Sequence, residues 1–111
     1  MQKMISVFDR GFLYGDGLFE TMRSYNGKVF KLDEHLSRLV TSAKIIKIKI
    51  PCSKRELKKE IYKSLKAKRL KDAYIRLTVT RGEGSIGLKP AAAPVKPKII
   101  IIAKKYEENP A

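Results

Sequence analysis

A glycine-rich segment that leads directly into an alternating one constrains this chain more than any other feature. Residues 9–23 read DRGFLYGDGLFETMR, with glycines at positions 11, 15 and 17 around Tyr14. Glycines at this density let the backbone turn tightly and pass close to a ligand or to another strand. The segment therefore predicts a close approach of the main chain just before a first strand.

Two strands with unlike faces are predicted. Residues 18–25 and 73–81 both alternate between apolar and polar or aromatic side chains, with the period of two that a strand requires. Asn26-Gly27 is a strong hairpin signal, so a short strand over 28–31 is expected to pair back on the first. The more polar faces of the two long strands carry Phe19, Thr21, Arg23 and Tyr25, and Tyr74, Arg76, Thr78 and Thr80.

Two helices are predicted between these strands. The first begins near Asp33 and carries an apolar stripe at helical spacing as far as Ile46. The second begins at Ser53-Lys54-Arg55-Glu56, which has the pattern of a capping box, and runs to about Leu70.

The remaining elements complete a fold class. Residues 89–97 hold three prolines and three alanines and predict a loop, and residues 98–104 predict a third long strand. The unbroken run from Ile99 to Ile102 predicts burial on both faces, in the middle of a sheet. The expected fold is α+β: a mixed or antiparallel β-sheet with two α-helices on one side, as a single domain over residues 1–111.

Composition narrows the cellular setting. Cys52 is the only cysteine, so neither an internal disulfide nor a cysteine metal cluster is expected. No apolar run approaches the ~18 residues of a membrane span, and no secretory leader is visible. A reducing cytoplasm is the simplest location. Many lysines and isoleucines also fit a heat-adapted protein.

Positive charge is concentrated in the second part of the chain. The formal net charge is +14, and 19 of the 25 Lys and Arg residues lie in residues 41–111. A charge of this size raises binding to nucleic acid as a possibility. Lysines on the solvated outer face of a helix explain it better, so nucleic acid is an improbable partner. A basic, non-catalytic binding or assembly domain stays open as the alternative from another functional class.

Several polar residues have both a chemical and a structural interpretation. Arg23 and Arg76, with aromatic and threonine neighbours, could line a pocket for a small carboxylate or could stand on a wet outer sheet face. Arg38 could bind phosphate or form an exposed pair with Glu34. His35 is the only histidine, and packing or hydrogen bonding explains it better than catalysis. Turns explain the two aspartates of the glycine-rich segment, and a flexible loop explains the G-x-G-x-x-G pattern of residues 82–87.

Taken together, four separated segments resemble the N-terminal domain of the fold-type IV pyridoxal-phosphate enzymes. This family includes branched-chain aminotransferases, aminodeoxychorismate lyases and D-amino-acid aminotransferases. The segments occur in the family's order and spacing, and they are the glycine-tyrosine opening, residues 19–23 (FETMR), residues 30–39 (FKLDEHLSRL) and residues 72–77 (DAYIRL).

The resemblance implies roles for particular residues. It implies that Arg38 holds the phosphate of pyridoxal 5′-phosphate, and that Tyr74 and Arg76 handle substrate carboxylates. It implies a substrate pocket lined by Tyr14, Phe19, Thr21, Arg23, Tyr74 and Arg76, with Leu88 reaching a neighbouring subunit's pocket. We therefore expect Arg38 to face the cavity that the two strands also overlook.

The resemblance also implies that a part of the enzyme lies elsewhere. In the family the Schiff-base lysine belongs to a C-terminal domain, and no lysine of this chain matches it. The chain is expected to be that enzyme's N-terminal part, inactive alone and without a cofactor of its own. Its expected partners are the C-terminal domain, further copies in a homo-oligomer, and amino-acid and 2-oxo-acid substrates; no metal site and no membrane contact are expected.

Within the family the motifs do not agree on one activity. Tyr74-x-Arg76 favours a branched-chain-type aminotransferase, whereas Thr21, where branched-chain enzymes usually carry glycine, leans toward aminodeoxychorismate lyase. The Arg-x-His carboxylate trap of the D-amino-acid enzymes has no match after Arg76, so that activity ranks third.

Overall fold

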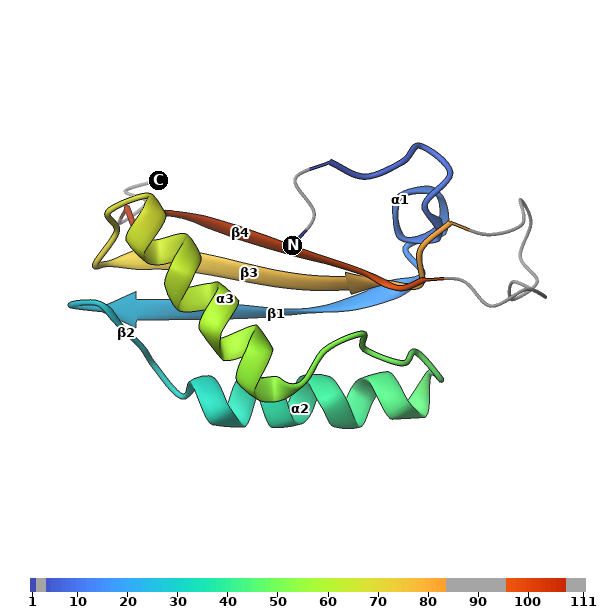
Figure 1. The fold of residues 1–111 in the computed structure, drawn as a ribbon, viewed down its shortest axis with the longest axis horizontal. Coiled ribbons are helices and arrows are strands. Elements are labelled where there is room, and N and C mark those ends of the chain that lie inside the picture. Colours follow the sequence, from blue (N-terminus) through green and yellow to red (C-terminus); the bar gives the residue numbers. More distant parts are fainter. Residues whose placement is uncertain (2–3, 84–95, 108–111) are drawn as a thin grey trace.

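A computed structural model describes residues 1, 4–83 and 96–107. Within them the elements in chain order are α1 (Arg10–Tyr14), β1 (Gly17–Tyr25), β2 (Lys28–Val29), α2 (Leu32–Ile45), α3 (Lys54–Ala67), β3 (Ala73–Thr80) and β4 (Lys98–Lys105). The strands form one antiparallel sheet in the order β2-β1-β3-β4. Helix α3 crosses one face of this sheet, and α2 runs beside β1 (Figure 1). The α+β prediction is confirmed.

The hydrophobic core lies between this face of the sheet and the two long helices. Alternate residues of the strands and the inward-facing residues of the helices form one cluster of buried side chains. Burial of one such side chain contributes about 1.5–3 kcal/mol. The largest members that are less than 2% exposed are Leu36, Leu39, Leu57, Ile61, Ile75, Leu77 and Val79. The other face of the sheet is not covered by α2 or α3, and we call it the open face.

The hairpin forms as the Asn26-Gly27 pair predicts. Both residues have positive φ, 48° and 85°, and they connect the paired residues Tyr25 and Lys28. Strand β2 is only two residues long, shorter than predicted. The chain leaves the sheet at Lys31, whose φ of 53° is in the left-handed region, and α2 begins at the next residue.

Helix α3 begins at the predicted capping box. Oγ of Ser53 accepts a hydrogen bond from the backbone N–H of Glu56 at 3.1 Å, and the Glu56 carboxylate accepts one from the Ser53 N–H at 3.1 Å. The helix ends at Ala67, three residues before the predicted end. Its lysines lie on the exposed face, as predicted. No helix in the described part of the chain is long and apolar enough to cross a membrane.

Strand β4 lies at the edge of the sheet, so its predicted central position is wrong. Four isoleucines in a row place an apolar side chain on both faces of the strand. The sequence alone cannot show whether both of these faces are buried. Ile102 points to the open face and is 47% exposed. Nζ of Lys68 donates to the outward carbonyl of Ala103 at 2.8 Å and blocks part of the unpaired edge.

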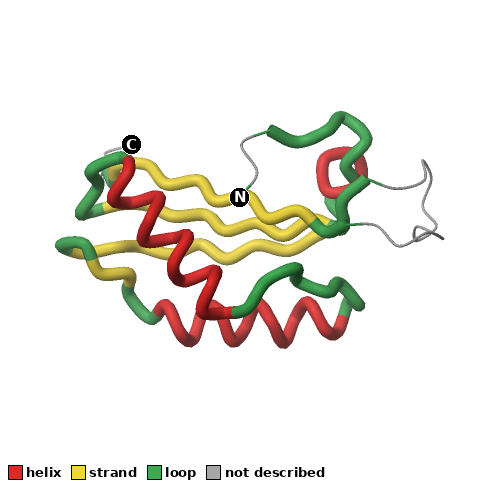
Figure 2. The backbone as a smooth tube through the Cα atoms, viewed as in Figure 1, coloured by secondary structure: helices red, strands yellow, loops and turns green. Residues whose placement is uncertain are grey.

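The glycine-rich segment contains a short helix that the sequence did not predict. Asp9 caps α1, because its Oδ1 accepts from the N–H of Gly11 at 2.7 Å while its Oδ2 accepts from Oγ1 of Thr80 at 2.8 Å. The predicted close approach occurs at Gly17, where a Cβ would lie 2.4 Å from the carbonyl oxygen of Val79. Figure 2 shows α1 at one end of the sheet, and the backbone N–H of Arg10 donates to the carbonyl of Gly82, two residues after β3, at 2.8 Å.

Candidate functional site

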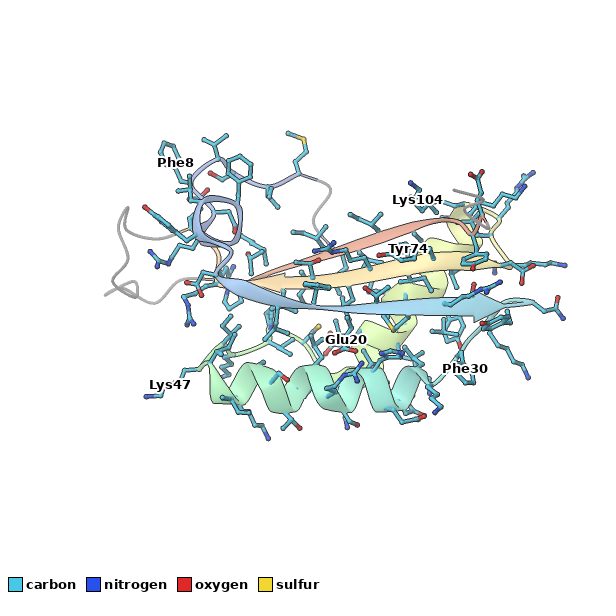
Figure 3. The ribbon with its side chains drawn as sticks, turned by 180° about the vertical axis from the view of Figure 1, so that it is seen from behind. Phe8, Glu20, Phe30, Lys47, Tyr74 and Lys104 are labelled. Carbon is cyan, nitrogen blue, oxygen red and sulfur yellow. The ribbon has the colours of Figure 1, made fainter. Side chains whose placement is uncertain are left out.

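The polar and aromatic faces of β1 and β3 do share one side of the sheet. Their register places Phe19 opposite Thr78, Thr21 opposite Arg76 and Arg23 opposite Tyr74. Residues directly opposite each other in an antiparallel pair point to the same face. Figure 3 looks on to this open face, with Tyr74 on it and α3 behind the sheet.

Two arginines of the open face lie over aromatic rings. The guanidinium carbon of Arg76 lies 4.1 Å from the centre of the Phe19 ring. That of Arg23 lies 3.4 Å from the Tyr106 ring and 4.3 Å from the Tyr25 ring. Such stacking holds the planar group in place and leaves its N–H groups for other partners.

Neither the Arg23 nor the Arg76 side chain forms a hydrogen bond or ion pair within the described residues, and the buried Nε of Arg23 has no partner there. The two are diagonal neighbours on adjacent strands, about 7–8 Å apart at the backbone. Two guanidinium groups with unused donors beside aromatic rings form a surface that suits small carboxylates.

The other residues predicted to line the substrate pocket lie in different parts of the chain. Thr21 and Phe19 are exposed on β1, Phe19 by 53%. Tyr14 ends α1, at the end of the sheet where β1 begins, and the Arg10 guanidinium lies 5.0 Å from its ring centre. Leu88 lies outside the described residues, as do most of the glycine-rich 82–87 loop and of the predicted 89–97 loop.

Arg38 does not share a cavity with the open face, which corrects our expectation. It lies on α2 and pairs with Glu20, whose side chain points to the helix side of β1. The sheet therefore separates Arg38 from Tyr74 and Arg76. In Figure 3 Glu20 lies between β1 and α2. The predicted alternative, a pair between Arg38 and Glu34, does not form either.

The Glu20 carboxylate is the centre of a buried polar cluster. Nη2 of Arg38 donates to Oε1 at 2.6 Å, and Nε donates to Oε2 at 2.9 Å. Nδ1 of His35 lies 2.7 Å from Oε1 and donates to it, since an ionised carboxylate only accepts. The hydrogen bonds from Arg38 lower the pKa of Glu20 despite its burial, with help from His35, and Glu20 in turn raises the pKa of Arg38.

Arg38 nevertheless keeps the features of a phosphate ligand. Its side chain is 65% exposed and lines a cavity of about 230 Å³ with Lys31, Glu34 and His35. Glu20 occupies Nε and one side of Nη2, so Nη1 has no protein partner in the described part of the chain. A planar guanidinium can bind a carboxylate along one edge and a phosphate along another. One charged group of a phosphate cradle therefore fits here.

A second ionic cluster stabilises the end of the sheet near α1. Oδ2 of Asp16 accepts hydrogen bonds from Nε of Arg10 and Nε of Arg81, both at 2.8 Å. Arg81 also donates to the carbonyls of Ile46 and Lys47, where α2 ends. Burial alone would raise the pKa of Asp16, but the two arginines outweigh it and lower the pKa.

Sequence reasoning missed Glu20 and interpreted Asp16 only as a turn residue, although one signal for Glu20 was present. Alternation places Glu20 on the buried face of β1, between Leu18 and Met22. A carboxylate on a buried face needs a hydrogen-bonded partner. That requirement points to a cation on the packed helix, but it does not say which one.

Comparison with known proteins establishes the class to which this fold and this site belong. Residues 17–111 match the family model for class IV aminotransferases, and the chain belongs to this family. Enzymes of this family depend on pyridoxal phosphate. The family assignment rests on this match and not on the position of Arg38.

Two similar proteins are described as different aminotransferases. The chain is 52% identical over 99 residues to a protein of Methanocaldococcus jannaschii described as "Putative branched-chain-amino-acid aminotransferase", covering 89% of this chain and 34% of that protein. It is 41% identical over 78 residues to the D-alanine aminotransferase of Listeria monocytogenes, covering 70% of this chain and 27% of the relative. The chain thus spans about a third of the length of these relatives.

Solved structures support this family assignment. The branched-chain amino acid aminotransferase of Escherichia coli superposes with a TM-score of 0.84 at 30% identity, over 94% of this chain and 35% of the enzyme. The 4-amino-4-deoxychorismate lyase of Pseudomonas aeruginosa superposes with a TM-score of 0.80 at 34% identity, over 99% of this chain and 39% of the lyase. The fold is therefore that of the N-terminal domain of class IV aminotransferases.

Proposed function

We propose that this chain is the N-terminal part of an enzyme that transfers an amino group between an amino acid, of branched-chain type, and a 2-oxo acid. The observation that carries the proposal is the pair of stacked arginines on the open face, which have no anionic partner in the described part of the chain. Both substrates of a transamination carry a carboxylate. The 52% identity to the Methanocaldococcus protein supports the branched-chain class.

The unpaired edge of β1 connects the two sides of the proposed site. Strand β2 pairs only with Ser24 and Tyr25, so within the residues that the structure describes β1 has no neighbouring strand on that side from Gly17 to Met22. A ligand along this edge can contact Arg38 on the helix side and Phe19 and Thr21 on the open face. The sheet separates Arg38 from Tyr74 and Arg76, but all three can still belong to one site that passes around the edge of β1.

Each side chain then has a definite task. Pyridoxal phosphate, when bound, supplies the electron sink for the chemistry at the amino-bearing carbon. Arg38 binds the phosphate through Nη1. Arg76 and Tyr74 orient a substrate carboxylate, and Phe19 shields it from water while keeping the Arg76 guanidinium flat. Thr21 and Arg23 complete the wall, with Tyr14 at the α1 end.

The chain supplies binding and orientation but not the cofactor lysine. We infer that this lysine belongs to a C-terminal domain, as the family resemblance implies, and that residues 1–111 alone neither retain the cofactor nor turn over substrate. The complete protein is proposed to be a homo-oligomer in which Leu88 approaches a neighbouring subunit.

Aminodeoxychorismate lyase is the second candidate. Thr21 favours it, as does the 34% identity to the Pseudomonas lyase over nearly the whole chain. The two activities share a cofactor and differ in the substrate that the open face must accept.

A chimaeric enzyme tests the proposal directly. The matched N-terminal residues of the Methanocaldococcus relative are replaced with this chain, and the purified chimaera is assayed with leucine and 2-oxoglutarate and with aminodeoxychorismate. We expect transamination of leucine, and we expect Arg76→Gln to raise KM for leucine by about ten-fold, the loss of one charge-assisted carboxylate contact. Arg69→Gln, an exposed arginine that follows α3, serves as the matched control.

The outcomes separate the two candidates. Release of pyruvate from aminodeoxychorismate without transamination would favour the lyase. A folded chimaera that holds the cofactor and is inactive with both substrates would refute the assignment of the open face.

A further inference from the structure

We propose that Glu20 is a positioning residue, which holds the Arg38 guanidinium so that its Nη1 edge is presented to a phosphate monoester. The inference rests on the proposed function, in which Arg38 binds the cofactor phosphate. It adds a role for a residue on the helix side of β1 that does not contact the ligand itself.

The geometry divides the arginine's donors into two sets. The Nε hydrogen and one Nη2 hydrogen point to the two oxygens of Glu20, at 2.9 and 2.6 Å. The pairing fixes the plane of the guanidinium and its rotation about the last side-chain bonds. The Nη1 hydrogens, and the second hydrogen of Nη2, then face away from Glu20. An anion can only approach from that side.

The two partners differ greatly in exposure to solvent. Glu20 is 8% exposed on the long strand β1, and its carboxylate also accepts from His35. The Arg38 side chain is 65% exposed, so without Glu20 it would sample many rotamers in water. An anion would then have to immobilise it at the time of binding, which costs rotamer entropy. The buried carboxylate removes that cost before the ligand arrives.

The charge of Glu20 has the opposite effect, since a carboxylate repels a phosphate. Glu34 offers a matched control for this effect. It lines the same cavity as Arg38, and its carboxylate forms no hydrogen bond or ion pair in the described part of the chain. Neutralising Glu34 therefore changes the local charge by the same amount without releasing the arginine.

The test is a titration of the 111-residue chain with inorganic phosphate at constant ionic strength. NMR follows the Nε–H signal of Arg38, and the backbone amides of β1 and β3 report whether each variant is folded. We expect Glu20→Gln to weaken phosphate binding about five- to ten-fold and to broaden the Arg38 signal, as expected for a released side chain. We expect Glu34→Gln to leave the affinity unchanged or to strengthen it.

The controls separate this inference from the function on which it rests. In Arg38→Gln, phosphate binding at this cavity should be lost; if it persists unchanged, Arg38 is not the phosphate ligand and both proposals fail. If Arg38→Gln abolishes binding but Glu20→Gln binds as tightly as the parent chain, only the positioning role is refuted. Should Glu20→Gln fail to fold, Glu20→Asp keeps the charge but is too short to span both nitrogens, and the same weakening is expected from it; undiminished binding would refute the positioning role.

Discussion

Nε of Arg81 lies 2.8 Å from Oδ2 of Asp16, although 65 residues separate the two in the sequence. Through this contact the segment before β1 is bound to the residue that follows β3. Because Arg81 also donates to the last carbonyls near α2, one side chain connects three parts of the fold.

We expect Asp16→Asn to lower the free energy of unfolding by about 2 kcal/mol. The substitution removes the carboxylate charge that Arg10 and Arg81 share, at side chains that are only 5% and 19% exposed, and the loss of charge-assisted hydrogen bonds at such sites is costly. Urea denaturation followed by circular dichroism measures the change. Asp33→Asn is the control, because the Asp33–Lys58 pair is exposed and should contribute less than about 0.5 kcal/mol. Equal losses in both variants would contradict the account of this cluster.

Acid should destabilise the chain through two carboxylates. The pKa values of Asp16 and Glu20 are lowered in the folded protein, so each contributes stability above its ordinary pKa, and this contribution is lost as the pH falls through the folded value. Stability should therefore decline below about pH 4.5, near the ordinary pKa of Glu. Denaturation curves between pH 7 and pH 2.5 measure it. In the Asp16→Asn, Glu20→Gln double variant the decline should be shallower, and an identical pH profile would contradict this attribution.

Substitutions at two glycines with positive φ distinguish the effect of backbone strain from that of a steric clash. At Gly15, φ is 65° and a Cβ would meet nothing within 4 Å, so Gly15→Ala should cost only about 1 kcal/mol. At Gly82, φ is 91° and a Cβ would lie 2.1 Å from the carbonyl oxygen of Lys96, so Gly82→Ala should cost about 3 kcal/mol or more. Thermal unfolding of the two variants gives the difference, and similar midpoints would show that the loop after β3 rearranges readily.

Most of the fold could be predicted because local signals and core burial agree. The Asn26-Gly27 turn, the Ser53–Glu56 capping box and the alternation of residues 18–25 each have one structural solution, and each is confirmed. The position of β4 could not be predicted from Ile99–Ile102. Whether a strand has one neighbour or two depends on long-range pairing and not on its own composition.

The candidate site could be predicted only in part, because it also depends on long-range packing. Period-two alternation was sufficient to place Arg23 and Arg76 on the more polar faces of their strands, and the register of β1 with β3 places these two faces on one side of the sheet. The side of the sheet on which Arg38 lies depends on how α2 packs, and its partner Glu20 lies 18 residues away in the sequence. A sequence motif identifies the residues of a site, but the packing of helices and strands determines which of these residues are in contact.

The exposed apolar side chains around α1 predict self-association of the isolated chain. Val7, Phe8 and Phe12 are between 55% and 63% exposed, and contiguous apolar surface of this kind favours contact with a partner. Light scattering should show concentration-dependent association. The Phe8→Ser, Phe12→Ser double variant should be closer to monomeric, whereas Ile45→Ser, at an exposed isoleucine at the end of α2 and outside this group, should change little. A monomer at all concentrations would contradict the prediction.

The chain alone should not catalyse transamination. When residues 1–111 are mixed with pyridoxal phosphate, leucine and 2-oxoglutarate, we expect no formation of glutamate above the rate of the free cofactor, because we propose that the cofactor lysine belongs to a C-terminal domain. A coupled glutamate assay measures it. Steady turnover that requires the folded chain would show that one of its own lysines performs this role.

The central claim is that the open face of the sheet recognises carboxylates through Arg23 and Arg76. Titration of the chain with 4-methyl-2-oxopentanoate, followed by NMR of the arginine Nε–H groups and the backbone amides, tests it most directly. The account predicts saturable shifts at Arg76, Arg23 and Thr21, with binding about ten-fold weaker in Arg76→Gln. Shifts confined to the lysines of α3, with the open face unchanged, would contradict it.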